Sequence, residues 1–97
     1  MAYSGKIVLH STSGYRPEHD DGFLRELHQD GIELFCVLGR DAAQWEDALD
    51  WICIGADGMG QHLIITTCHK NASLEEVVEF AKIFRTAHEH VVQVIER

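Results

Sequence analysis

Residues able to bind an anion lie together near the beginning of the sequence. His10 and Arg16 flank a run of hydroxyl and glycine residues, Ser11-Thr12-Ser13-Gly14. Hydroxyls and backbone N–H groups beside the start of a helix are the groups with which phosphate-binding loops hold their ligands. The same run is also ordinary turn chemistry between a strand and a helix. The sequence therefore leaves two interpretations of this segment, an anion site and a plain connecting loop.

A second reactive group is Cys68, which follows an apolar stretch and directly precedes His69. A cysteine nucleophile needs a partner that lowers the pKa of its thiol, and His69 or His10 could act as that base. Neighbouring residues of a strand point to opposite faces, so His69 can serve only if the strand ends before Cys68. The alternative is that Cys68 packs as a small apolar residue, which we also expect of Cys36 and Cys53.

The seven histidines of the chain suggest a third kind of site, one for zinc or a similar divalent ion. The candidate ligands are His10, His19, Asp20, Cys68 and His69. A structural zinc site normally has paired ligands about two to four residues apart, and the histidines and cysteines do not follow such a spacing. The sequence therefore identifies no metal site and no cofactor.

The segments that would position these residues alternate between two patterns. Apolar runs rich in β-branched residues predict buried strands, and apolar residues spaced by three and four predict helices. We expect strands at residues 6–10, 32–38 and 62–68, and helices at about 20–30, 41–54 and 73–84. The last segment, residues 90–95, has strong β preference but also continues the helical spacing. We expect a fourth strand there, with continued helix as the alternative.

Strands that alternate with helices predict an α/β domain, a three-layer sandwich around a short parallel sheet. We expect the flavodoxin-like strand order 2-1-3-4, in which strands one and three are neighbours. Ligands of such sheets bind beyond the carboxyl ends of the strands, where the order reverses. The candidate rim at that place consists of His10, Ser11, Arg16, Cys68 and His69.

Length and charge limit the classes of function. The composition fits one domain over residues 1–97. The chain has 8 Lys and Arg residues against 16 Asp and Glu residues, and its formal net charge of −8 repels nucleic acids and anionic membranes. The apolar runs are far shorter than the roughly 18 residues of a membrane span. Three cysteines without a Cys-x-x-Cys motif fit a reducing compartment. We expect a soluble cytoplasmic protein.

A candidate interface lies on the second predicted helix. Trp51 follows Trp45 by six residues and so faces a different direction, where Ile54 joins it in a small apolar patch. Exposed aromatic patches mark protein interfaces. The alternative is a helix buried on both sides.

The second half of the chain resembles small uncharacterised bacterial α/β proteins in three segments, Trp45–Trp51, Thr66–His69 and Ser73–Ala81. The resemblance implies a stand-alone bacterial domain, and it implies no activity and no role for any residue. Our leading hypothesis is a non-enzymatic protein-interaction module that binds a protein partner or forms a homodimer. The alternative is a small phosphate- or metal-dependent enzyme that uses the candidate rim.

Overall fold

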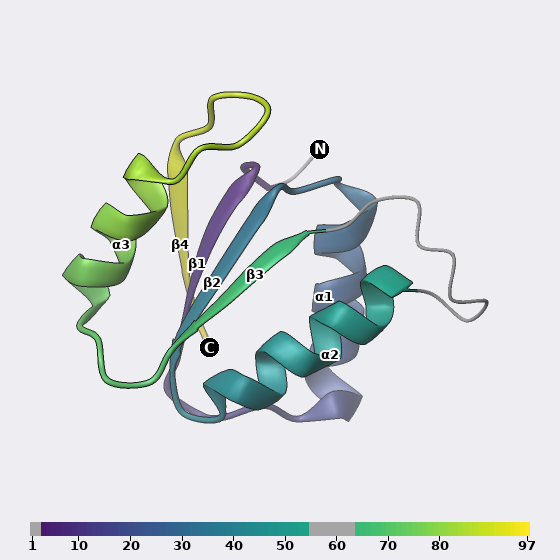
Figure 1. Cartoon of the computed structure of the whole chain (residues 1–97). Helices are drawn as coiled ribbons and strands as arrows, with labels where there is room; N and C mark the ends of the chain where they lie inside the picture. The colour runs from purple at the N-terminus through teal and green to yellow at the C-terminus, as the bar shows by residue number, and fades with distance from the viewer. Residues whose placement is uncertain (1–2, 55–63) are drawn as a thin grey trace.

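The computed structural model describes residues 3–54 and 64–97 and confirms the α/β class. The elements follow one another as β1 (Lys6–Ser11), α1 (Pro17–Gln29), β2 (Leu34–Gly39), α2 (Ala42–Ile54), β3 (Ile65–His69), α3 (Leu74–Ile83) and β4 (Val92–Glu96) (Figure 1). The last segment is therefore a strand and not a continuation of the third helix. Residues 62–63, the start of the expected third strand, lie outside the described part.

The four strands form one parallel sheet in the order β3-β2-β1-β4. This order differs from the expected 2-1-3-4, because β2 lies between β1 and β3. The burial of the strands gives the reason. All but one residue of β2 is buried, which requires a neighbour on each side, whereas every residue of β3 is at least partly exposed. Thr66, Thr67 and His69 make β3 better suited to the edge of the sheet than to its centre.

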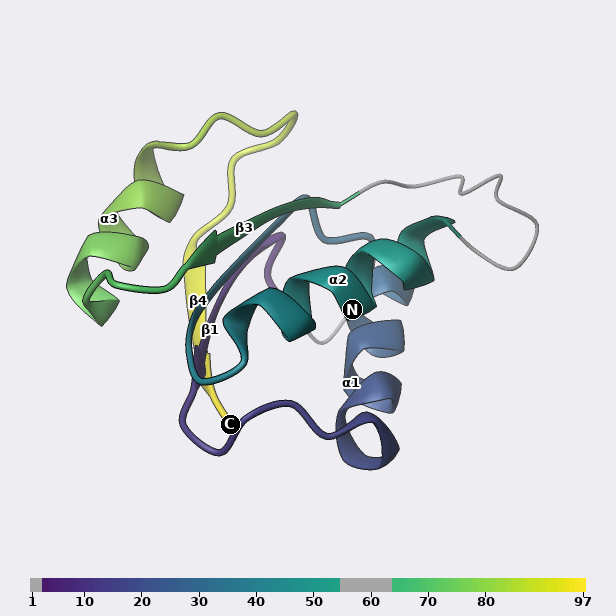
Figure 2. The ribbon, with the colours of Figure 1, turned by 60° about the horizontal axis from the view of Figure 1, so that its bottom comes forward.

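Helices cover both faces of the sheet. Figures 1 and 2 show α1 and α2 on one side and α3 alone on the other. Alternate residues of β1 face the two layers: Ile7 and Leu9 join a core cluster with Trp45 of α2, and Val8 joins a second cluster with Val77 of α3. The expected three-layer sandwich is present.

The helix starts are fixed by different contacts. At α3 a capping box is present: Glu76 N donates to Ser73 Oγ (3.2 Å), and Ser73 N donates to Glu76 Oε1 (3.3 Å). Directly before α2, the carboxylate of Asp41 accepts the backbone N–H of Tyr15 (3.1 Å) and so joins the loop after β1 to the loop after β2. The backbone of Asp41 has a φ of 58°.

A buried lysine holds the other end of α3. Lys6 of β1 is 5% exposed, and its Nζ donates to the carbonyl oxygens of Ala81 (2.7 Å), Phe84 (2.7 Å) and Lys82 (3.3 Å). A cation at the carboxyl end of a helix also interacts favourably with the helix dipole. Lys6 thus ties the single helix of its layer to the central part of the sheet.

Replacement of Lys6 by Met should destabilise the domain, because the three carbonyl groups lose their donor. We expect the free energy of unfolding to fall by about 1–3 kcal/mol in urea denaturation. The control Lys70→Met removes an exposed lysine and should change it by less than about 0.5 kcal/mol. Equal effects of the two substitutions would contradict the role of Lys6 as a cap.

A second contact, which we call the loop latch, consists of Gly5, Glu33 and His90. The Glu33 carboxylate accepts the backbone N–H groups of Ala87 and His88 (both 3.1 Å) and lies 2.5 Å from Nε2 of His90. The His90 ring fills the space beside Gly5, where a Cβ atom would lie 2.3 Å from it. The latch therefore holds the loop between α3 and β4 against the amino ends of β1 and β2.

The latch should make stability depend on acid pH. Burial would raise the pKa of Glu33, but the hydrogen bonds from His90, His88 and Ala87 outweigh it and hold the pKa below its ordinary value. The stabilisation is therefore complete above the ordinary glutamate pKa of about 4.3 and is lost as the pH falls through the lower folded-state value. Glu33→Gln should lower the melting temperature at pH 7 and flatten its acid-side slope. Glu89→Gln, in the same loop, should leave that slope unchanged; a slope equally steep in Glu33→Gln would refute the latch.

Candidate functional site

The sheet order separates the two halves of the candidate rim. His10 of β1 lies in register with Leu38 of β2, which lies in register with His69 of β3. With strands about 4.8 Å apart, the backbones of the two histidines are roughly 10 Å apart. Cys68 points to the other face of the sheet, where it packs against the cluster that contains Trp45. The structure therefore does not bring His10, Cys68 and His69 together.

Ser11 belongs to the core. It is 2% exposed, and its Oγ accepts a hydrogen bond from Nε1 of Trp45 (2.9 Å). The hydroxyl supplies the partner that a buried indole N–H requires. Its backbone oxygen also accepts the N–H of Arg40 (2.9 Å). Both oxygen atoms of Ser11 are thus engaged in holding the carboxyl ends of β1 and β2 together with α2.

The two histidines of the rim have separate partners. His10 Nδ1 lies 3.8 Å from the carboxylate of Glu96 on the neighbouring strand β4. His69 Nε2 is hydrogen-bonded to the hydroxyl of Thr67 (2.8 Å), and its ring packs against Phe80 of α3. Burial lowers the pKa of His69, which keeps its imidazole neutral near pH 7. The two imidazole rings therefore have no common partner among the described residues, because His10 lies beside β4 and His69 contacts Thr67 of β3 and Phe80 of α3.

The surroundings of Cys68 oppose a thiolate. Burial, followed by the nearby Glu46 carboxylate, raises the pKa of the Cys68 thiol; Lys70 acts in the opposite direction and Asp47 adds to the rise. A nucleophilic cysteine has the reverse environment, with cations or a helix N-terminus that lower its pKa. The electrostatics thus agree with Cys68 as a packing residue.

Alkylation should therefore be slow at Cys68. With iodoacetamide at pH 7.5, we expect slower modification than for cysteine in an unfolded peptide, and a rate that rises only above the ordinary thiol pKa of about 8.5. Peptide mapping by mass spectrometry separates Cys68 from the buried Cys36 and Cys53. Rapid modification of Cys68 at neutral pH would show that a thiolate forms there after all.

With this strand order, the reversal that marks ligand crevices in such sheets falls between β1 and β4. A hollow of about 230 Å³ lies there, lined by Ser13, Gly14, Arg16, His19, Asp20 and Arg97. Arg97 pairs with the buried Asp20 (2.5 Å), and its backbone oxygen accepts the N–H groups of Thr12 (2.6 Å) and Ser13 (3.0 Å). The other oxygen of Asp20 accepts the N–H of Arg16 (2.8 Å).

These contacts change the interpretation of the first loop. Two of its backbone N–H groups, which an anion would need, already donate to Arg97. Of the candidate rim, only Arg16 lines the hollow. Sequence reasoning missed Arg97, because its pairing with Asp20 spans 77 positions and depends on β4 lying beside β1.

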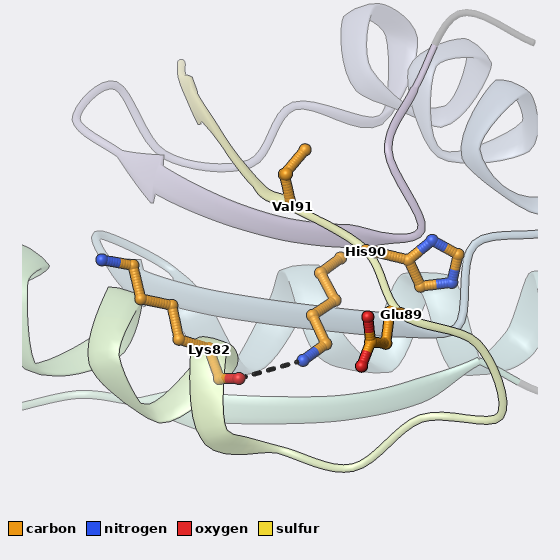
Figure 3. Close-up of a pocket in the computed structure, with 5 residues that line it drawn as sticks. Lys82, Glu89, His90 and Val91 are labelled. Atoms are coloured by element: carbon orange, nitrogen blue, oxygen red, sulfur yellow. Dashed lines mark hydrogen bonds between the residues drawn. The ribbon is translucent and has the colours of Figure 1, made fainter.

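A larger hollow, of about 430 Å³, lies at the opposite end of the strands and is lined by Lys6, Lys82, Glu89, His90 and Val91 (Figure 3). The Lys6 amine is already bonded to the end of α3. Figure 3 shows the side chains of Lys82 and His90 extending to opposite sides. The hollow therefore has no lysine amine free of the fold at Lys6, and the side chains of Lys82 and His90 do not face each other across it.

The described residues that could act as metal ligands do not form a cluster. Within residues 3–54 and 64–97, no group of three or more His, Cys, Asp or Glu side chains is arranged to hold a metal ion. The set considered from the sequence is dispersed, because His10 and Cys68 lie on different strands and different faces of the sheet.

The candidate interface on α2 is exposed. Trp51 is 73% exposed and Ile54 is 39% exposed, whereas Trp45 on the same helix is fully buried. Trp45 packs with Tyr15 and Phe23, so one side of α2 forms the core and the other carries Trp51. The helix is not buried on both sides.

The fold and the site define a small three-layer α/β domain in which the residues of the candidate rim contact separate strands and helices. The chain belongs to a family described as a domain of unknown function, DUF7684, whose model matches residues 4–95. The match covers both halves of the chain. No curated protein and no solved structure matches it.

No helix among the described residues is long and apolar enough to span a lipid bilayer.

Proposed function

We propose that this domain is a non-enzymatic protein-interaction module that docks through Trp51 and Ile54 of α2. The observation that carries the proposal is the 73% exposure of Trp51, the largest apolar side chain on the described surface. Tryptophan is enriched among the residues that contribute most to binding energy, since it buries a large area with few rotatable bonds. A partner that covers Trp51 and Ile54 would remove both from water.

Charge favours a different protein over a second copy as the partner. The helix carries Glu46, Asp47 and Asp50 and has no lysine or arginine. Burial, and then the charges of Asp50 and Asp47, raise the pKa of Glu46, which indicates that these carboxylates repel one another. A symmetric dimer through Trp51 would place two such acidic helices face to face, at an electrostatic cost.

The enzyme alternative has less support. A nucleophile, its base and an oxyanion donor must lie within hydrogen-bond reach of one another. His10 and His69 are on strands separated by β2, and Cys68 is on the opposite face from His69. The raised pKa of the Cys68 thiol adds to this argument.

Trp51→Ala should abolish association and leave the fold intact. We expect the wild-type chain to elute from an extract of its native cells, by size-exclusion chromatography, well above the 11.0 kDa of its monomer, and the variant to elute as a monomer. The unfolding free energy should change by less than about 0.5 kcal/mol, as for an exposed residue. Ile65→Ala, an exposed residue of β3, serves as the control.

Sedimentation velocity of the purified chain separates a homodimer from a complex with another protein. A strictly monomeric chain in both experiments, unaffected by Trp51→Ala, would rule the proposal out.

A further inference from the structure

The outer side of α3 carries a hollow that the packing of the domain does not use. Its volume is about 540 Å³, and it is lined by Glu75, Glu76, Glu79, Phe80 and Ile83. Figures 1 and 2 both show α3 at the outside of the molecule, with the sheet on one side of it only. The hollow therefore lies on the surface farthest from α2 and Trp51.

Helical periodicity explains the outward glutamates of the hollow but does not explain Ile83. Val77 and Ala81 are fully buried against the sheet, so Glu75 and Glu79 face outwards, as polar residues should. Ile83 shares the outward side, and it is 77% exposed. An isoleucine at this position contributes almost nothing to the core, whereas a covering partner would bury most of its side chain.

The apolar wall of the hollow is already in place. The ring of Phe80 packs edge-on against His69 (4.9 Å between ring centres) and contacts the ring of Phe84 (5.6 Å). His69 belongs to β3, and Phe84 is the residue that ends α3. Phe80 is thus held in position while part of its ring remains exposed beside Ile83. A preformed wall reduces the entropy lost on binding.

The charges around the hollow are mostly negative. Three glutamates line it. One of them, Glu79, forms an ion pair with Lys82 (3.5 Å). One carboxylate oxygen of Glu76 accepts the N–H of Ser73, and its second oxygen is not used by that cap. The whole chain has a formal net charge of −8, so a second copy would be repelled from this surface.

We propose that the outer face of α3 binds a basic amphipathic helix of a partner protein. One large apolar side chain of that helix inserts between Phe80 and Ile83, and lysine or arginine residues one turn away pair with Glu75 and Glu79. The complementary charge selects a basic segment, and the residues that line the hollow recur along α3 from Glu75 to Ile83, which suits recognition of a second helix. This surface is separate from the Trp51 surface, and the inference does not depend on the function proposed there.

The test uses a fluorescein-labelled synthetic helix of leucine and lysine, with leucines spaced by three and four, and measures fluorescence anisotropy on the full chain. We expect binding that weakens with added salt. Ile83→Ser and the double variant Glu75→Gln/Glu79→Gln should each weaken it about tenfold, a loss of about 1.4 kcal/mol. Circular dichroism checks that each variant is folded.

Two controls separate this surface from general charge and from the α2 surface. Glu18→Gln/Asp47→Asn removes the same number of exposed carboxylates from the other layer and should leave the affinity within about twofold, as should Trp51→Ala. A peptide of the same composition with scrambled order should bind at least about tenfold more weakly. No binding by the wild-type chain, an equal loss in the two double variants, or a loss in Trp51→Ala but not in Ile83→Ser would overturn the inference.

Discussion

The pairing of β1 with β2 is the constraint on which the rest of the structure depends. Nearly every residue of these two strands is buried, so both faces of the sheet must be covered and both strands need a further neighbour. Two helices cover one face, but α3 alone covers the other. Ile65 of β3 and Val94 of β4 lie in register with residues of the second core cluster, yet they remain 48% and 45% exposed. The unequal cover explains why the layer of α3 leaves apolar surface open.

The elements could be predicted from the sequence because their patterns are local. The apolar run of β2 and the capping box of Ser73 and Glu76 each lie within a few residues. The order of the strands depends on contacts between distant segments, because the most completely buried strands must lie at the centre of the sheet. The sequences of the two strands do indicate their positions in the sheet. β3 contains two threonines and is partly polar, which suits an edge, whereas β2 is apolar and suits the centre.

The candidate site could be predicted less well, because its contacts join distant positions. Trp45 donates to Ser11 over 34 positions, and Arg97 pairs with Asp20 over 77 positions. A list of hydroxyl, carboxylate and basic residues does not reveal which of them are already bonded to one another. The sequence therefore identifies the polar and titratable residues of this region, whereas the partners that they contact are known only from the three-dimensional structure.

The contact between Gly5 and His90 limits how sequences of this family can diverge. Any side chain at position 5 would occupy the space of the imidazole ring, so an alanine there requires a smaller or displaced residue at position 90. Without the ring, Glu33 would lose one of its three donors and the loop would lose part of its attachment. Substitutions at positions 5, 33 and 90 should therefore be coupled, because a change at one of them alters the space or the hydrogen bonds of the other two.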